Sequence, residues 1–299
     1  VAAIRAAQLG KKVAVVEKES PGGVCLNWGC IPTKALLKSA DVYEKIKHAA
    51  DYGLVVSGAS ADFGKIIARS RDVVSKMTKG VQFLLKKNKI EYFQGTAKFI
   101  SGNSMSVASG IGAPVILEFT NAIVATGARP RSFPNLPVDG KRIINYREAM
   151  SLAELPKKML VIGAGAIGVE FASFYHALGT EVTIVEVVDR ILPVEDRDIS
   201  KEAERQIAKR GIKILTSTTV EALKNTGSGV SATLKSGDKL EEWSGDIALV
   251  SVGMVGNSEG LGLEPLGIEI EKSFIYVSVA FSFIVELLNI RFRTKNKKA

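Results

Sequence analysis

An internal repeat constrains this 299-residue chain more than any other feature of its sequence. Residues 1–17, VAAIRAAQLGKKVAVVE, align without gaps to residues 170–186, EFASFYHALGTEVTIVE. The identical pairs are Ala3/Ala172, Leu9/Leu178, Gly10/Gly179, Val13/Val182, Val16/Val185 and Glu17/Glu186. Each copy reads as a helix, a glycine stop, a strand and an acidic residue, so the repeat predicts two related α/β units.

A glycine-rich loop precedes the second copy. Residues 159–168, MLVIGAGAIG, join an apolar strand to Gly163, Gly165 and Gly168 in the pattern G-x-G-x-x-G. Such a loop lets a pyrophosphate rest on the N-terminus of the next helix. Glu186 stands 18 residues after the last glycine, where its carboxylate can bind both ribose hydroxyls and repel a 2′-phosphate. The segment predicts a site for NAD rather than NADP; a glycine-rich turn without a ligand is the alternative.

Periodicity and turn residues extend the α/β pattern along the chain. We expect helices near 32–50, 62–87 and 199–210, strands near 182–186, 212–215 and 247–253, and a hairpin around 226–229. Short strands are expected to fill 90–126 and to end in the buried run AIVATG at 122–127. The expected fold class is α/β with two doubly wound Rossmann-like nucleotide-binding domains. The first strand and glycine loop of the first domain are expected to lie upstream of Val1.

The only two cysteines, Cys25 and Cys30, lie in the stretch GGVCLNWGCIPTK at 22–34. Two thiols cannot build a secreted disulfide framework or a four-ligand zinc site, and no metal is expected. Cys30 stands at the start of a proline-initiated helix, where the helix dipole and Lys34 favour a thiolate. The spacing therefore favours a redox-active pair. Two buried cysteines that never form a disulfide are the alternative.

Composition excludes several other classes of protein. With 46% hydrophobic and 24% charged residues, the chain is neither disordered nor fibrous. Residues 273–299 hold five bases and one acid, so the net charge of +9 falls to +5 without them, and no nucleic-acid partner is expected. The apolar run at 274–290 contains Glu286 and is shorter than the roughly 20 residues that span a membrane, so no span is expected. The opening segment does not read as a signal peptide, so a cytoplasmic location is expected, with the mitochondrial matrix as alternative.

The stretch GGVCLNWGCIPTKALL resembles the redox-disulfide segment of the FAD-dependent pyridine nucleotide-disulfide oxidoreductases, and it is similar to their class I dihydrolipoyl dehydrogenase subfamily. The resemblance runs to about Glu271 through VATGARPR (124–131), VIGAGAIGVEFASF (161–174), VEVVDRILPVED (185–196) and NSEGLGLEPLGIEIE (257–271). It implies FAD and NAD as cofactors and a homodimer for the parent protein. It also implies, as partners, the dihydrolipoyl groups of a 2-oxo acid dehydrogenase or glycine cleavage complex.

The resemblance also implies roles for individual residues. Cys25 is expected to exchange with dihydrolipoyl thiols and Cys30 to contact the flavin, while Lys34 pairs with Glu170 near the flavin. The residues expected to bind FAD are Glu17, Gly22, Gly23, Lys34, Ala97, Thr126 and Gly127. Those expected to bind NAD are Gly163, Gly165, Ile167, Gly168, Glu170, Glu186, Val220 and Gly253.

The chain departs from the family pattern at several places. Met254 and Val255 follow Gly253, where members usually carry an arginine and another polar or proline-flanked residue. We expect a chain truncated at both ends. It would hold an FAD-binding domain at 1–145, an NAD-binding domain at 146–272 inserted in it, and a returning FAD segment or aberrant basic tail at 273–299. The family's interface domain, which bears a His-Glu pair, is expected to be absent.

The expected activity of the parent protein is oxidation of dihydrolipoyl groups through the disulfide and FAD, with reduction of NAD⁺. His48 and His176 are expected to be exposed helix residues rather than catalytic bases. One alternative is an inactive remnant that at most binds NAD(H). Another is a related reductase of glutathione, mercuric ion or a quinone.

Overall fold

The computed structural model describes residues 1–110 and 112–268, and the chain divides into two compact units. The first unit comprises residues 1–15, 19–92 and 126–257. Within the described chain, the second comprises residues 16–18, 93–110, 112–125 and 258–268. The segment at 273–299, expected to be a returning strand or a tail, lies outside the described residues.

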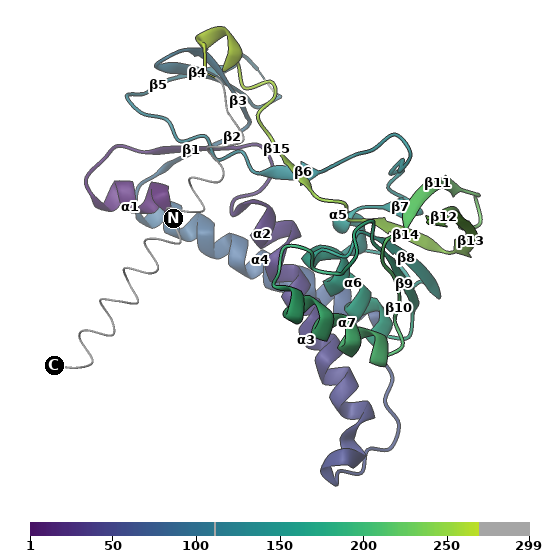
Figure 1. The fold of residues 1–299 in the computed structure, drawn as a ribbon. Helices are drawn as coiled ribbons and strands as arrows, with labels where there is room; N and C mark the ends of the chain where they lie inside the picture. The colour runs from purple at the N-terminus through teal and green to yellow at the C-terminus, as the bar shows by residue number, and fades with distance from the viewer. Residues whose placement is uncertain (111, 269–299) are drawn as a thin grey trace, which may run out of the picture. The chain divides into compact units, whose positions relative to one another are not determined.

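A five-stranded parallel sheet lies at the core of the first unit, with the strands in the order β10-β9-β8-β14-β7 (Figure 1). The strands are β7 (Ile143–Ile144), β8 (Lys158–Ile162), β9 (Glu181–Val185), β10 (Lys213–Leu215) and β14 (Ile247–Val250). Residues 159–162 and 182–185 are all buried. Continuous burial of this kind is typical of a parallel sheet that is covered on both faces.

The strand order is that of a Rossmann-type α/β fold. Along the chain, β8, α6 (Ala166–Ala177), β9, α7 (Arg197–Lys209) and β10 alternate, so the sheet grows outward from β8 in one direction. The chain then crosses to the other side of β8, where Leu249 of β14 lies opposite Val161. Doubly wound sheets bind their ligands where the strand order reverses, which here is between β8 and β14.

Different layers cover the two faces of this sheet. On one face, α3 (Cys30–Lys47) and α6 pack on β8 and β9 through fully buried side chains that include Leu36, Phe171 and Phe174. The other face carries an antiparallel sheet of β11 (Thr219–Asn225), β12 (Val230–Ser236) and β13 (Lys239–Gly245). The hairpin expected around 226–229 joins β11 to β12.

Three helices form the cysteine-bearing part of the first unit: α2 (Gly23–Trp28), α3, and α4 (Phe63–Lys87). The carboxylate of Asp62 accepts a hydrogen bond from the backbone N–H of Lys65 at 3.0 Å and so caps α4. Ser70 of α4 donates to the carbonyl oxygen of Pro32 at 3.1 Å, which ties α4 to the first turn of α3. Across residues 1–110 and 112–268, no helix is long and apolar enough to cross a membrane.

Shorter elements complete the first unit. These are α1 (Ala2–Gln8), the 3₁₀ turn Ala49–Tyr52, α5 (Tyr146–Ala149), and the antiparallel pair of β6 (Ala128–Pro130) with β15 (Met254–Gly256). Strands β1 (Ala14–Glu17) and β2 (Glu91–Gln94) pair with each other and pass from the first unit into the second.

An antiparallel sheet of β3 (Thr96–Ser101), β4 (Ser104–Ala108) and β5 (Val115–Glu118) forms most of the described second unit. The backbone N–H of Phe99 donates to the carbonyl oxygen of Leu261 at 2.7 Å. A Cβ on Gly262 would lie 2.5 Å from the Phe99 oxygen, so this close approach requires glycine. The segment at Leu261 and Gly262 is thereby held against β3, just before the 3₁₀ turn Glu264–Leu266.

The prediction of a buried strand at residues 122–127, AIVATG, is wrong. These residues form no strand, and the side chains of Ile123 and Val124 are 77% and 42% exposed. A strand needs a partner for its backbone N–H and C=O groups, and none of the described strands pairs with this run. The coarser expectation, a Rossmann-type α/β fold, is confirmed.

Candidate active site

A disulfide joins Cys25 in α2 to Cys30, the first residue of α3. Their Cα atoms lie 4.7 Å apart, and both residues are exposed. Of the two alternatives left open by the sequence, the bonded pair is the one present. Because Cys30 begins an 18-residue helix, the free N–H groups and the dipole of that helix favour negative charge on its sulfur.

Buried Asn27 holds the loop that leads into α2. Its Nδ2 donates to the carbonyl oxygens of Ser20, Pro21 and Gly23 at 3.5, 3.2 and 2.9 Å. Its Oδ1 accepts from the hydroxyl of Thr78 on α4 at 3.0 Å. The Asn27 side chain thus fixes the loop before Cys25 and connects it to α4.

An ion pair links α3 to α6. The ammonium of Lys34, one turn after Cys30, contacts the carboxylate of Glu170. The Lys34 side chain is 61% exposed and the Glu170 side chain 28% exposed. The pairing expected from the resemblance is therefore present, and it joins the helix that begins at Cys30 to the helix that follows the glycine loop.

The three loop glycines have different surroundings. A Cβ on Gly163 would lie 2.5 Å from the carbonyl oxygen of Ser251, and one on Gly168 would lie 2.0 Å from the carbonyl oxygen of Gly163. A Cβ on Gly165 would meet nothing within 4 Å. The first and third glycines are thus required by packing, whereas the middle one leaves open space at the start of α6, where a pyrophosphate can approach the backbone.

Glu186 follows β9, and only 8% of the residue is exposed. Its Oε2 accepts from the N–H of Ala164 at 2.7 Å, and its Oε1 accepts from the N–H of Val188 at 3.1 Å. The carboxylate is therefore fixed directly beside the glycine loop. An acid at this position next to an open glycine cradle fits the adenosine ribose and pyrophosphate of a dinucleotide.

The other residues expected at the NAD site come from three separate segments. Ile167 is partly buried in the first turn of α6. Val220 is buried in β11, and its carbonyl oxygen accepts from Asn135 at 3.0 Å. Gly253 follows β14 with φ +106° and open space at its Cβ position.

Comparison with known proteins identifies the family. The sequence model described as pyridine nucleotide-disulphide oxidoreductase matches residues 1–280. The chain belongs to this family. The dihydrolipoyl dehydrogenase of Zymomonas mobilis is 47% identical over 278 residues, which are 93% of this chain and 60% of that protein. The Bacillus subtilis dihydrolipoyl dehydrogenase is 42% identical over 288 residues, 93% of this chain and 61% of that protein.

Two solved structures share the fold of this chain. LpdA from Mycobacterium tuberculosis has a TM-score of 0.82 at 27% identity and covers 90% of this chain and 59% of its own. The flavoprotein disulfide reductase RclA from Escherichia coli has a TM-score of 0.75 at 27% identity, with 90% of this chain and 57% of its own covered. The chain thus spans about three-fifths of the length of these relatives.

The flavin residues expected from the oxidoreductase family fall in both units. Those in the first unit are Gly22, Gly23, Lys34, Thr126 and Gly127, and those in the second are Glu17 and Ala97. Gly22 and Gly23 have φ of +108° and +69°, a backbone conformation that favours glycine. Gly127 has φ +74°, and its carbonyl oxygen accepts from the N–H of Asn257 at 2.9 Å.

The two histidines differ in burial. His48 follows the last residue of α3 with its side chain 64% exposed, and its Nδ1 lies 3.6 Å from the carboxylate of Asp51. His176 is partly buried, so the expectation that it is exposed is wrong. Its Nε2 lies 2.8 Å from the carbonyl oxygen of Arg210, because the end of α7 packs against α6 at this point.

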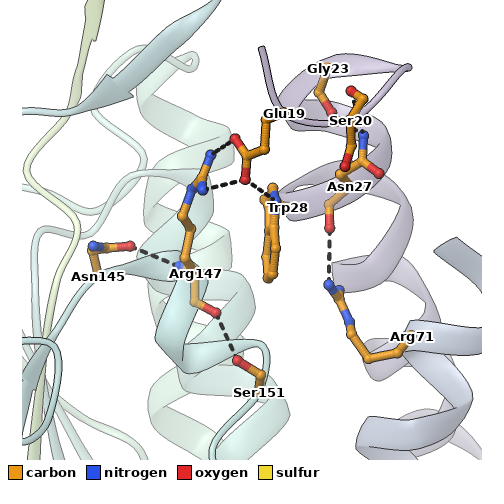
Figure 2. A network of polar contacts seen from close by, with 9 residues as sticks. All are labelled: Glu19, Ser20, Gly23, Asn27, Trp28, Arg71, Asn145, Arg147 and Ser151. Atoms are coloured by element: carbon orange, nitrogen blue, oxygen red, sulfur yellow. Dashed lines mark hydrogen bonds and ion pairs between the residues drawn. The ribbon is translucent and has the colours of Figure 1, made fainter. Parts of the chain in front are cut away.

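Sequence reasoning missed a group of side chains around Trp28, the residue that ends α2 (Figure 2). The group consists of Glu19, Trp28, Arg71 and Arg147, and we call it the Trp28 cluster. Trp28 lies between the two cysteines in sequence, which is a signal that could have been used. Glu19, Arg71 and Arg147 come from separate segments, and no spacing rule connects them.

Proposed function

We propose that this chain is the disulfide- and nucleotide-binding part of a dihydrolipoyl dehydrogenase, which passes two electrons from a dihydrolipoyl group through Cys25–Cys30 to NAD⁺. One observation carries the proposal: Lys34–Glu170 joins the helix of the redox cysteine to the helix of the glycine loop. An exposed disulfide and a dinucleotide cradle are thereby parts of one packed unit. The names of the Zymomonas and Bacillus relatives favour the same substrate.

The chemistry of the disulfide follows from its position. A dihydrolipoyl thiolate attacks Sγ of Cys25, the disulfide bond breaks, and the electron pair leaves on Cys30, where the α3 N-terminus stabilises a thiolate. The second dihydrolipoyl thiol, as thiolate, then attacks the substrate sulfur of the mixed disulfide. That step closes the lipoyl disulfide and releases Cys25. Two electrons have moved to the cysteine pair, and two protons have left the substrate thiols.

The nucleotide end of the proposal rests on the glycine cradle. Gly163, Gly165, Gly168 and Glu186 would hold the pyrophosphate and ribose of NAD⁺, with Ile167, Glu170, Val220 and Gly253 at its edges. A buried carboxylate beside the cradle repels the 2′-phosphate of NADP.

FAD is proposed at Glu17, Gly22, Gly23, Lys34, Ala97, Thr126 and Gly127. When bound, it supplies a two-electron carrier between the cysteine pair and NAD⁺. In the proposed domain organisation, the NAD-binding domain at 146–272 is inserted in an FAD-binding domain that begins at 1–145.

The proposed partners are lipoyl-bearing subunits of a 2-oxo acid dehydrogenase or glycine cleavage complex, and a second copy of the parent protein. The proposed location is the cytoplasm, or the mitochondrial matrix for a mitochondrial parent.

One experiment tests the chain as it exists. The purified protein is incubated with FAD, its visible absorbance is recorded, and NADH formation from NAD⁺ and dihydrolipoamide is followed. We expect the chain to bind flavin and to form NADH. The Cys25→Ser variant is expected to form no NADH. Flavin binding with turnover of glutathione in place of dihydrolipoamide would change the proposed substrate. NADH binding without flavin binding or turnover would identify the chain as a nucleotide-binding remnant.

A further inference from the structure

Trp28 is held between two arginine side chains (Figure 2). The guanidinium carbon of Arg71 lies 5.0 Å from the centre of its ring, and that of Arg147 lies 5.2 Å away. Its Nε1 donates to a carboxylate oxygen of Glu19 at 3.1 Å. Cations over an indole face attract its π electrons, so all three contacts favour one position of the ring.

Arg147 is itself held firmly. Its two terminal nitrogens donate to the two carboxylate oxygens of Glu19 at 2.7 and 2.8 Å, a bidentate pair. Hydrogen bonding to Glu19 raises the pKa of Arg147 above its ordinary value. Its backbone N–H donates at 2.8 Å to Asn145, the residue that caps α5 together with Glu148. Arg147 therefore joins the end of α2 to the start of α5.

Arg71 fixes the backbone at the same place. Its Nη1 donates to the carbonyl oxygen of Asn27 at 3.0 Å, one residue before Trp28. Burial lowers the pKa of the Arg71 guanidinium. Side chains from α4 and α5 thus hold the last turn of α2, which is separated from Cys30 by Gly29 alone.

We propose that Trp28 and Arg147 are positioning residues for the Cys25–Cys30 couple, which hold the end of α2 beside the start of α3 and so favour the disulfide over the dithiol. A disulfide requires its two Cα atoms to be close, and they lie 4.7 Å apart here. In the dithiol form no bond enforces that distance. Holding α2 in place raises the effective concentration of one thiol at the other, and this favours closure.

This inference rests on the proposed function only in taking the cysteine pair as a redox couple. The reaction to be measured is exchange of the protein disulfide with dithiothreitol. Protein disulfide plus reduced dithiothreitol gives protein dithiol plus cyclic oxidised dithiothreitol. Two electrons and two protons move from the reagent to the protein. The measurement needs neither flavin nor nucleotide, so it is independent of the turnover assay.

The test is the equilibrium constant of this exchange for the full chain. Samples are equilibrated in defined mixtures of reduced and oxidised dithiothreitol at one pH, free thiols are alkylated, and the two forms are quantified by mass spectrometry. We expect Trp28→Leu and Arg147→Met each to shift the equilibrium about tenfold toward the dithiol, equal to about 30 mV. Trp28→Phe keeps the aromatic face, so its equilibrium is expected to stay close to that of the unmodified chain.

Matched controls separate positioning from general loss of stability. Trp243→Leu removes the other tryptophan, which is buried in β13. Arg205→Met removes an arginine that pairs with Glu202 on the exposed face of α7. Both controls are expected to stay within twofold of the unmodified chain. The proposal is overturned if the controls shift the equilibrium as much as Trp28→Leu and Arg147→Met do. It is also overturned if those two variants shift it less than twofold, or shift it toward the disulfide.

Discussion

Lys34 and Glu170 form an ion pair between two helices, four residues after Cys30 and two residues after Gly168. The pair is a direct side-chain link between the helix that begins at Cys30 and the helix that follows the glycine loop. Both side chains retain contact with solvent, at 61% and 28% exposure, so the pair adds little to the stability of the fold. We therefore expect its loss to affect activity more than stability.

The first prediction concerns Lys34→Met. Because the ion pair is largely exposed, the free energy of unfolding should fall by less than about 1 kcal/mol. In the proposed function Lys34 lies at the flavin, so dihydrolipoamide-dependent NADH formation should fall at least about tenfold. Urea unfolding and the turnover assay measure the two effects.

Lys38→Met is the control for this change. Lys38 lies one turn further along α3, its side chain is also 61% exposed, and it pairs with Asp41. We expect the same small change in stability and full turnover. If the Lys38 variant loses as much activity as the Lys34 variant, the proposed role of Lys34 is wrong.

The second prediction separates the glycines of the loop. Gly168→Ala places a methyl group 2.0 Å from the Gly163 oxygen and should destabilise the fold by about 1–3 kcal/mol or more. Gly165→Ala meets nothing within 4 Å, so its unfolding curve should be unchanged, while its affinity for NADH falls because the methyl group occupies the approach of the pyrophosphate. Denaturation and NADH fluorescence titration measure these effects. Unchanged NADH affinity in Gly165→Ala would refute pyrophosphate binding at the glycine loop.

The third prediction concerns the choice of nucleotide by Glu186. Glu186→Gln removes the charge next to the proposed ribose site, so the preference for NADH over NADPH should fall about tenfold, or about 1.4 kcal/mol. Titration with each nucleotide gives the ratio of the two Kd values. Glu195→Gln, at an exposed position in the following loop, is expected to leave that ratio unchanged.

The sequence predicts the repeated local parts of this molecule and misses its long-range polar contacts. The glycine loop, β9 and α4 follow from glycine spacing and apolar periodicity, which act over a few residues. The run AIVATG reads as a buried strand, yet its state depends on a pairing partner that its own residues do not specify. Glu19 and Arg147 are 128 residues apart, and no local rule brings them together at Trp28.

The fourth prediction is a pH dependence at Asp139. Burial opposes ionisation of this carboxyl, but hydrogen bonds from Asn225 and from the backbone N–H groups of Lys141, Arg142 and Ile143 outweigh it, so the pKa is lowered. A lowered folded-state pKa contributes stability above the unfolded value of about 3.9, and that stability is lost as pH falls through the folded-state pKa. Asp139→Asn should therefore be less stable at neutral pH, and the difference should shrink below about pH 4.

Urea unfolding across this pH range measures that difference. Asp238→Asn, in the exposed turn between β12 and β13, is the control and should be about as stable as the unmodified chain at neutral pH. A gap between Asp139→Asn and the unmodified chain that stays constant down to about pH 2 would contradict the assigned hydrogen bonds.

The last prediction concerns buried Asn27, whose Nδ2 faces the carbonyl oxygens of Ser20, Pro21 and Gly23. Asn27→Asp keeps the shape but places an oxygen against three oxygens, so it should cost about 1–3 kcal/mol or more at neutral pH. Thr78→Val removes only the bond to Oδ1 and should cost less. Protonation of the introduced carboxyl returns one O–H donor to this position, so the Asn27→Asp penalty should shrink in acid. Urea unfolding at neutral and acidic pH measures the free energy of unfolding of each variant. If Asn27→Asp loses less of it than Thr78→Val, the three hydrogen bonds to carbonyl oxygens do not hold the segment before Cys25.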